Sequence, residues 1–160
     1  MQEAVERHTR RLRILCAALL ASLALYGALV LTLPLQAPPA LPQGEALLWG
    51  FAFLAAVNVV TIMPVYRAML AAPRRVFAVG RQPERLLAAH LSAHLVAYGR
   101  LEAVSILGLV LDFLTGRQDW FWVFTGVAAL GMALLWPRRG KVAALVAIPG
   151  ETALDAPARY

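Results

Sequence analysis

Four long apolar runs dominate this chain, and they constrain its fold more than any other feature. The runs cover residues 12–35, 46–66, 93–114 and 120–136. A helix needs about 20 predominantly apolar residues to cross the hydrocarbon core of a bilayer, and each run meets or approaches that length. The rest of the chain is too short for a soluble domain with its own core. The sequence therefore predicts an all-α integral membrane protein: a single domain over 1–160, with four transmembrane helices in two hairpins.

Composition supports this fold class. The chain is 61% hydrophobic and 15% charged, with a mean hydropathy of +0.67, whereas soluble domains are about 45–50% apolar and about 25% charged. The first apolar run has a basic start, as a signal peptide does. Its apolar core is about 20 residues long, well beyond the usual 7–15, so it is expected to be an uncleaved span.

The positions of the basic residues predict the orientation. Thirteen of the fifteen Lys and Arg residues fall within 7–13, 67–85 and 138–159, and the first and third connections hold one cation between them, Arg117. Cytoplasmic segments collect Lys and Arg. Both termini are therefore expected in the cytoplasm, with 1–11 and 138–160 as tails. This bias also explains the net charge of +6. The basic residues set the orientation and contact anionic lipid, and no nucleic-acid partner is expected.

The connections between the runs have their own signals. Residues 35–44 are rich in proline and predict a stiff, non-helical external connection. The second span is expected to end between 63 and 67, followed by a cytoplasmic loop through Pro73 and Gly80. A helix should restart at Pro83 or Glu84 and continue into the third span. Residues 115–119 predict a tight external turn, and 142–148 is too short to cross the membrane.

The third span carries nearly all the polar side chains of interest. Glu102 lies near its middle, where an ionisable group costs roughly 2.5–3.5 kcal/mol on insertion scales and marks a functional or packing position. It shares about a third of the helix circumference with other polar residues, and such a stripe should face protein or water rather than lipid. The members of the stripe are His90, His94, Tyr98, Glu102, Ser105 and Asp112.

Two interpretations of this stripe stay open. Glu102 could be the titrating site of a proton or cation relay. Alternatively, the stripe could be a buried interhelical cluster in which Glu102 packs against Asn58 of the second span, whose amide can bond a carboxyl group. Arg100 points away from Glu102, because residues two apart do not meet on a helix. It could snorkel to the cytoplasmic head groups or pair with a carboxylate from another span or subunit.

Other chemistry finds little support in the sequence. His90 and His94 are spaced so that both could reach one metal ion, but no cysteine or second carboxylate stands nearby to complete a site. No phosphate-binding loop, nucleophile elbow or metalloprotease motif is present. We therefore expect no enzyme activity, no catalytic residues, no metal and no cofactor. The candidate polar or ion-binding positions are Glu102, Asn58, Tyr98, Ser105, Arg100 and His94.

Residues 81–114 resemble the polar loop and second helix of the proteolipid ring subunit of rotary ATP synthases. Arg81, Gln82 and Pro83 match the loop of that family, and Glu102 matches its ion-carrying carboxylate. The resemblance implies proton or Na⁺ translocation through Glu102. It does not extend to the glycine-packed first helix of the family, since 46–66 holds only Gly50, and the first and fourth spans have no counterpart there.

The whole chain is also similar to a set of uncharacterised small bacterial membrane proteins with four spans. The shared features are a mid-membrane Glu in the third span, a Leu-Thr-Gly turn at 114–116 and a Trp-Pro exit at 136–137. This similarity implies a multi-pass protein of the bacterial inner membrane. The expected function is that of a structural or accessory subunit, which packs with itself or with a larger membrane complex through the polar face of the third span.

Overall fold

A computed structural model describes residues 2–33, 44–80 and 82–147, and within these ranges the chain forms helices and no strands. The expected proline-rich connection at 35–44 falls almost wholly outside the described residues, as does the end of the tail at 148–160. The helices are α1 (Gln2–Thr32), α2 (Gly44–Val60), α3 (Ile62–Gly80), α4 (Pro83–Thr115), α5 (Gln118–Leu134) and α6 (Arg139–Val146). The all-α prediction is confirmed for the described part of the chain.

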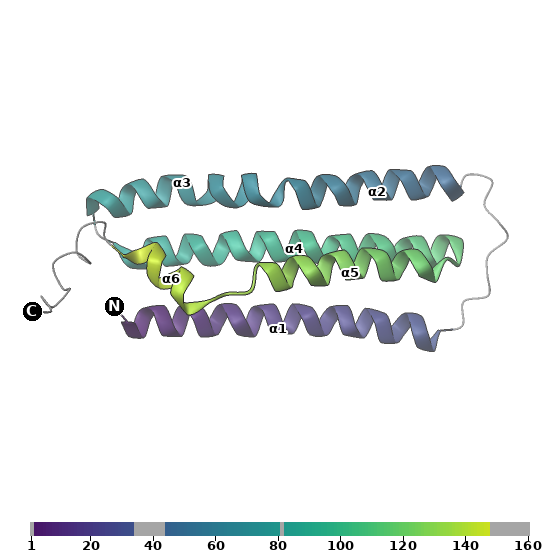
Figure 1. Ribbon diagram of the computed structural model, residues 1–160, viewed down its shortest axis with the longest axis horizontal. Helices are drawn as coiled ribbons and strands as arrows, with labels where there is room; N and C mark the ends of the chain where they lie inside the picture. The colour runs from purple at the N-terminus through teal and green to yellow at the C-terminus, as the bar shows by residue number, and fades with distance from the viewer. Residues whose placement is uncertain (1, 34–43, 81, 148–160) are drawn as a thin grey trace, which may run out of the picture.

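Helix α4 is the centre of the bundle. It packs against α1, α2, α3 and α5, and most extensively against α5. Figure 1 shows α2 and α3 as one nearly continuous rod on one side, α1 on the other, and α4 and α5 between them. The helix that carries the polar stripe is therefore also the helix with the most neighbours.

Three helical stretches are long and apolar enough to cross a membrane. They are α1, the rod over Gly44–Ala78 and α4, and a fourth span is possible if α5 and α6 count as one bent pair, with 54° between them. Alone, the 17 residues of α5 rise about 25 Å, slightly less than a hydrocarbon core of about 30 Å. The described residues thus contain three to four candidate spans.

The region after the second span is helical, which corrects the expectation of a loop through Pro73 and Gly80. Helix α3 continues to Gly80 with Pro73 inside it. Leu70 and Phe77 of this helix are buried, and such packing overrides the local cost of a proline. The one break in the rod lies at Thr61, between α2 and α3. Three residues later Pro64 has no N–H to donate to the carbonyl of Val60.

Both ends of α4 lie where the sequence predicted them. The helix begins at Pro83, and it ends at Thr115 before Gly116, whose φ of 67° is left-handed. The Gly116 amide donates to the Asp112 carbonyl at 2.7 Å. Glycine adopts this cap conformation without a Cβ clash, and α5 begins two residues later. The predicted turn at 115–119 is therefore present.

A close approach of α4 and α5 depends on Gly108. A Cβ atom built there would lie 2.7 Å from the Cβ of Phe124 and 3.3 Å from the Cα of Phe121. Only a residue without a side chain fits between the two helices at this point. Small residues at helix crossings are typical of membrane bundles, where van der Waals packing drives association.

We call the end of the bundle where α1 begins, α3 ends and α4 begins the basic end. Helix α6 folds back onto it and is not a free tail, because Val142 and Val146 are buried there. A small hydrophobic cluster joins the four helices at this end: Val5, Phe77, Leu86, Leu87, Val142 and Val146. Helices α1 and α4 are about 46 and about 50 Å long. Their first ten residues or so therefore extend beyond the spans predicted to start at Leu12 and Ala93.

Candidate functional site

The polar stripe of α4 faces protein, as its spacing predicted. Glu102 is half-buried, and the other five members are buried: His90, His94, Tyr98, Ser105 and Asp112. Polar groups inside a span are stabilised by partners within the protein because lipid offers none, although neither carboxyl oxygen of Asp112 has a partner among the described residues. Their partners therefore show how the bundle is held together.

Glu102 bonds to α1. The hydroxyls of Ser22 and Tyr26 both donate to Glu102 Oε1, at 2.8 and 3.1 Å. The prediction that Glu102 bonds to Asn58 is wrong, since Asn58 Nδ2 donates to the Leu54 carbonyl of its own helix at 3.0 Å. The physical reason is the direction of the stripe: at Glu102 it faces α1, whereas α2 packs on another side of α4. Asn58 is half-buried and bonds to no other helix among the described residues.

Two further bonds tie α4 to the chain that follows it. The hydroxyls of Ser105 and Thr125 lie 2.7 Å apart and are buried between α4 and α5. The Tyr98 hydroxyl donates to the Leu135 carbonyl at 3.0 Å, just after α5 ends. Interhelical bonds of this kind are worth roughly 0.6–2 kcal/mol in a membrane. Tyr98 and Ser105 thus have structural partners within the chain.

Arg100 lies on the opposite side of α4 from Glu102. Its guanidinium donates to the hydroxyl of Thr61, at the break between α2 and α3. The side chain is half-buried. The ion pairs among the described residues are Glu3–Arg7 and Arg117–Asp119, so no described carboxylate pairs with Arg100. A carboxylate partner from another span is therefore not found among the described residues, whereas contact with the head groups or with a carboxylate of another subunit stays a prediction.

All three histidines of the chain meet at the basic end. His8 Nε2 lies 3.0 Å from His90 Nδ1, and the rings of His90 and His94 have centroids 4.3 Å apart. The sequence analysis missed His8, because no periodicity links α1 to α4. A signal existed within α1: His8 falls three residues after Val5 and four before Leu12, and all three are buried on one helix face.

Burial keeps two of these histidines neutral. It lowers the pKa of His90 to about 3, with smaller effects from His94, His8 and Arg74. Burial also lowers the pKa of His8, helped by His94 and Arg11. Both residues lie outside the predicted spans, in the parts of α1 and α4 that extend beyond them. In the described part of the chain, no group of three His, Cys, Asp or Glu side chains is arranged to hold a metal ion.

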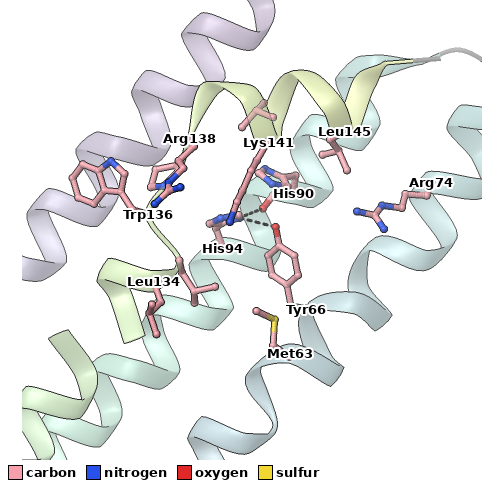
Figure 2. Close-up of a pocket in the computed structure, with 13 residues that line it drawn as sticks. Met63, Tyr66, Arg74, His90, His94, Leu134, Trp136, Arg138, Lys141 and Leu145 are labelled. Carbon is pink, nitrogen blue, oxygen red and sulfur yellow. Dashed lines mark hydrogen bonds between the residues drawn. The ribbon is translucent and has the colours of Figure 1, made fainter. Parts of the chain in front are cut away.

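A cavity of about 240 Å³ lies beside the histidines (Figure 2). It is bounded by α3, α4, the end of α5 and α6. Its polar lining consists of Tyr66, Arg74, His90, His94, Arg138 and Lys141. In Figure 2 Lys141 reaches from α6 toward His94, and Arg74 approaches from α3. The described chain thus has two candidate sites: the ionisable residues Arg100 and Glu102 on opposite sides of α4, and this basic cavity.

Neither a family model, nor a curated protein, nor a solved structure matches the chain. A function therefore has to be inferred from the chain's own residues. The contacts of Arg100 and Glu102 and the lining of the basic cavity supply the chemistry for that inference.

Proposed function

We propose that this chain is a non-enzymatic protein of the bacterial inner membrane, with four spans and both termini in the cytoplasm. It acts as a structural or accessory subunit that packs with a second copy of itself or with a larger membrane complex. The Lys and Arg bias supports the orientation, and the apolar helices support the spans. The polar groups of α4 that bond to α1 and α5 support a structural role for this helix.

Arg100 is the observation that carries this proposal. A guanidinium inside a membrane is costly unless it is paired, and a threonine hydroxyl satisfies only one of its five donors. Glu102, two residues away, is bonded to α1 instead. Arg100 is half-buried and can still be reached from outside the bundle. A carboxylate from a partner would therefore stabilise it.

A second copy can supply that carboxylate. On α4 an exposed face lies between Arg100 at one edge and Glu102 at the other, and its apolar members include Leu95, Val96 and Ile106. Gly99 and Ala103 stand in the middle of this face. They are four residues apart, the small-xxx-small spacing that lets membrane helices approach closely. A Cβ atom on Gly99 would meet nothing within 4 Å, so the chain's own packing does not require glycine there.

Two-fold symmetry places the charges opposite each other. When two α4 helices pack in parallel through Gly99 and Ala103, the edge that carries Arg100 in one copy meets the edge that carries Glu102 in the other. Arg100 of each copy then lies beside Glu102 of the other, with a depth difference of about 3 Å. Ser22 and Tyr26 donate to Oε1 of Glu102, which leaves Oε2 for the partner. We therefore favour the homodimer over a larger complex.

Disulfide cross-linking in native membranes tests this packing. In a Cys16→Ser background, Gly99→Cys should form a dimer on oxidation. Leu25→Cys is the matched control, since Leu25 is exposed on α1 next to Tyr26 and lies outside the proposed contact. Arg100→Gln should weaken the dimer about five- to tenfold, from the loss of roughly 1–1.5 kcal/mol. Arg117→Gln should leave it unchanged.

Three outcomes would count against the homodimer. Equal cross-linking at positions 99 and 25 would indicate random collision. The absence of any cross-link from Gly99→Cys, in folded and inserted protein, would remove the contact. A cross-link formed only with a different protein would replace the second copy by a larger complex.

Proton or Na⁺ translocation is the second candidate, and the surroundings of Glu102 favour it. This half-buried carboxyl accepts two hydroxyl donors on one oxygen, and 81–114 resembles the proteolipid subunit. An ion-carrying carboxyl must alternate between charged and neutral forms. Proteoliposomes should then show a proton or Na⁺ flux that Glu102→Gln abolishes. No flux above empty liposomes would exclude this candidate.

A further inference from the structure

The basic cavity has an unusual charge balance for its size. Of the thirteen residues that line it, Arg74, Arg138 and Lys141 are cationic and none is acidic. The three cations come from α3, from the linker after α5 and from α6, so the fold brings them together. All three are exposed, which places them at the rim. The ion pairs among the described residues involve other cations, Arg7 and Arg117.

The floor of the cavity offers one free hydrogen-bond donor, the hydroxyl of Tyr66. His94 Nδ1 lies 3.1 Å from the His90 carbonyl and 3.3 Å from the Tyr66 hydroxyl (Figure 2). A carbonyl oxygen only accepts, so Nδ1 must carry the proton. Nδ1–H then points to both oxygens, and the hydrogen of the Tyr66 hydroxyl is free for another acceptor. His90 and His94 are buried, each with 6% of its surface exposed.

Size restricts the occupant. The cavity volume is about 240 Å³. Sites for drug-sized ligands are larger, about 300–1,000 Å³, so this cavity suits a compact group. Guanidinium groups form paired hydrogen bonds to phosphate oxygens, and lysine adds a point charge.

We infer that the basic cavity binds a phosphate group, with Arg74, Arg138 and Lys141 contacting its oxygens and the Tyr66 hydroxyl donating from the floor. The cavity lies at the boundary of the predicted spans, because Met63 and Leu134 line one side of it. The phosphate could belong to a soluble phosphate monoester or to the head group of phosphatidic acid, which is also a monoester, so both present the same terminal phosphate group. This site is separate from the α4 face and does not depend on the dimer.

Two probes distinguish these sources in the full-length protein. Inorganic phosphate is titrated calorimetrically into the protein in an uncharged detergent at constant ionic strength. In parallel, thermal stability is measured in phosphatidylcholine nanodiscs with and without a minor fraction of phosphatidic acid. Saturable binding in the first measurement indicates a soluble phosphate. Stabilisation in the second measurement alone indicates a lipid head group, and either result supports the phosphate site.

The chain supplies a matched pair of variants. The double variant Arg74→Gln and Lys141→Gln should weaken phosphate binding at least about tenfold in whichever of the two measurements responds. Each substitution removes a charge-assisted hydrogen bond to the phosphate, and such bonds are among the strongest in proteins. Arg75→Gln with Arg139→Gln removes the same charge from exposed residues that do not line the cavity, and binding should change by less than about twofold. Circular dichroism confirms that both double variants fold.

Two results would overturn this inference. Equal losses of binding in the two double variants would mean that the overall positive charge of the basic end attracts phosphate and that the cavity is not a specific site. No saturable binding of inorganic phosphate and no stabilisation by phosphatidic acid would mean that the cavity binds no phosphate at all.

Discussion

Acidification should destabilise the basic end through His90. This histidine is buried, bonded to His8 and faced by His94 and Arg74. Its contact with His8, at 3.0 Å between Nε2 and Nδ1, needs one donor and one acceptor, so both rings cannot be protonated. A proton added to His90 places a charge in a buried site beside Arg74, and the bond then survives only while His8 stays neutral and accepts.

The sign and size follow from the pKa values. The pKa of His90 is 6.5 in the unfolded chain and about 3 in the folded one, so the unfolded chain binds more protons between these values. Stability from neutral His90 is complete above about pH 6.5 and falls as the pH drops toward 3. Between pH 7.5 and pH 5 the loss is about 2 kcal/mol. His8, whose pKa is also lowered by burial, acts in the same direction.

Thermal unfolding in an uncharged detergent measures this loss. At about 2–4 °C per kcal/mol, the wild-type melting temperature should fall by about 4–8 °C between pH 7.5 and pH 5. His90→Gln keeps a polar side chain without a titrating ring. It should lose markedly less over the same interval, whatever its stability at pH 7.5. An equal fall in the variant and the wild type would refute the assignment of this acid sensitivity to His90.

Two further predictions concern the membrane-embedded core. Gly108→Ala should lower the free energy of unfolding by about 1–3 kcal/mol, because its Cβ would lie 2.7 Å from Phe124; Gly126→Ala, where a Cβ meets nothing within 4 Å, is the control in the same thermal assay. Asp112 is buried, and neither carboxyl oxygen has a partner among the described residues. Asp112→Leu should therefore raise the melting temperature, from about 1–3 kcal/mol of recovered desolvation, and a lower one would show that Asp112 has a bound partner.

Local signals predicted the parts of this fold that depend on one helix. Pro83 marks the start of α4 and Gly116 its end, since each residue has a backbone preference that acts within one turn. The spacing of the polar residues on α4 predicted a buried stripe for the same reason. The loop predicted through Pro73 was wrong, because Leu70 and Phe77 pack against other helices, and that packing is not visible in the local sequence.

The partners of the polar residues could not be predicted, because the sequences of apolar helices do not show which helix packs against which. Nothing in the sequence shows whether α4 presents Glu102 to α1 or to α2, since both helices carry side chains that can bond a carboxyl group, Ser22 and Tyr26 on α1 and Asn58 on α2. Asn58 was an attractive partner by depth alone, yet Ser22 and Tyr26 fill that role. Depth can be read from a sequence, whereas the direction around the helix axis depends on which neighbour packs there.

The basic cavity could not be predicted from the sequence either. Arg74, Arg138 and Lys141 belong to segments that the sequence assigned to one side of the membrane by their charge. That assignment treats every cation alike. The fold separates them: Arg74 and Lys141 line a cavity, whereas their neighbours Arg75 and Arg139 do not. Orientation needs only the number of positive charges on each side, but phosphate binding needs particular ones to converge. The two double variants remove equal charge, so a difference between them would show that the positions of Arg74 and Lys141 in the fold determine phosphate binding.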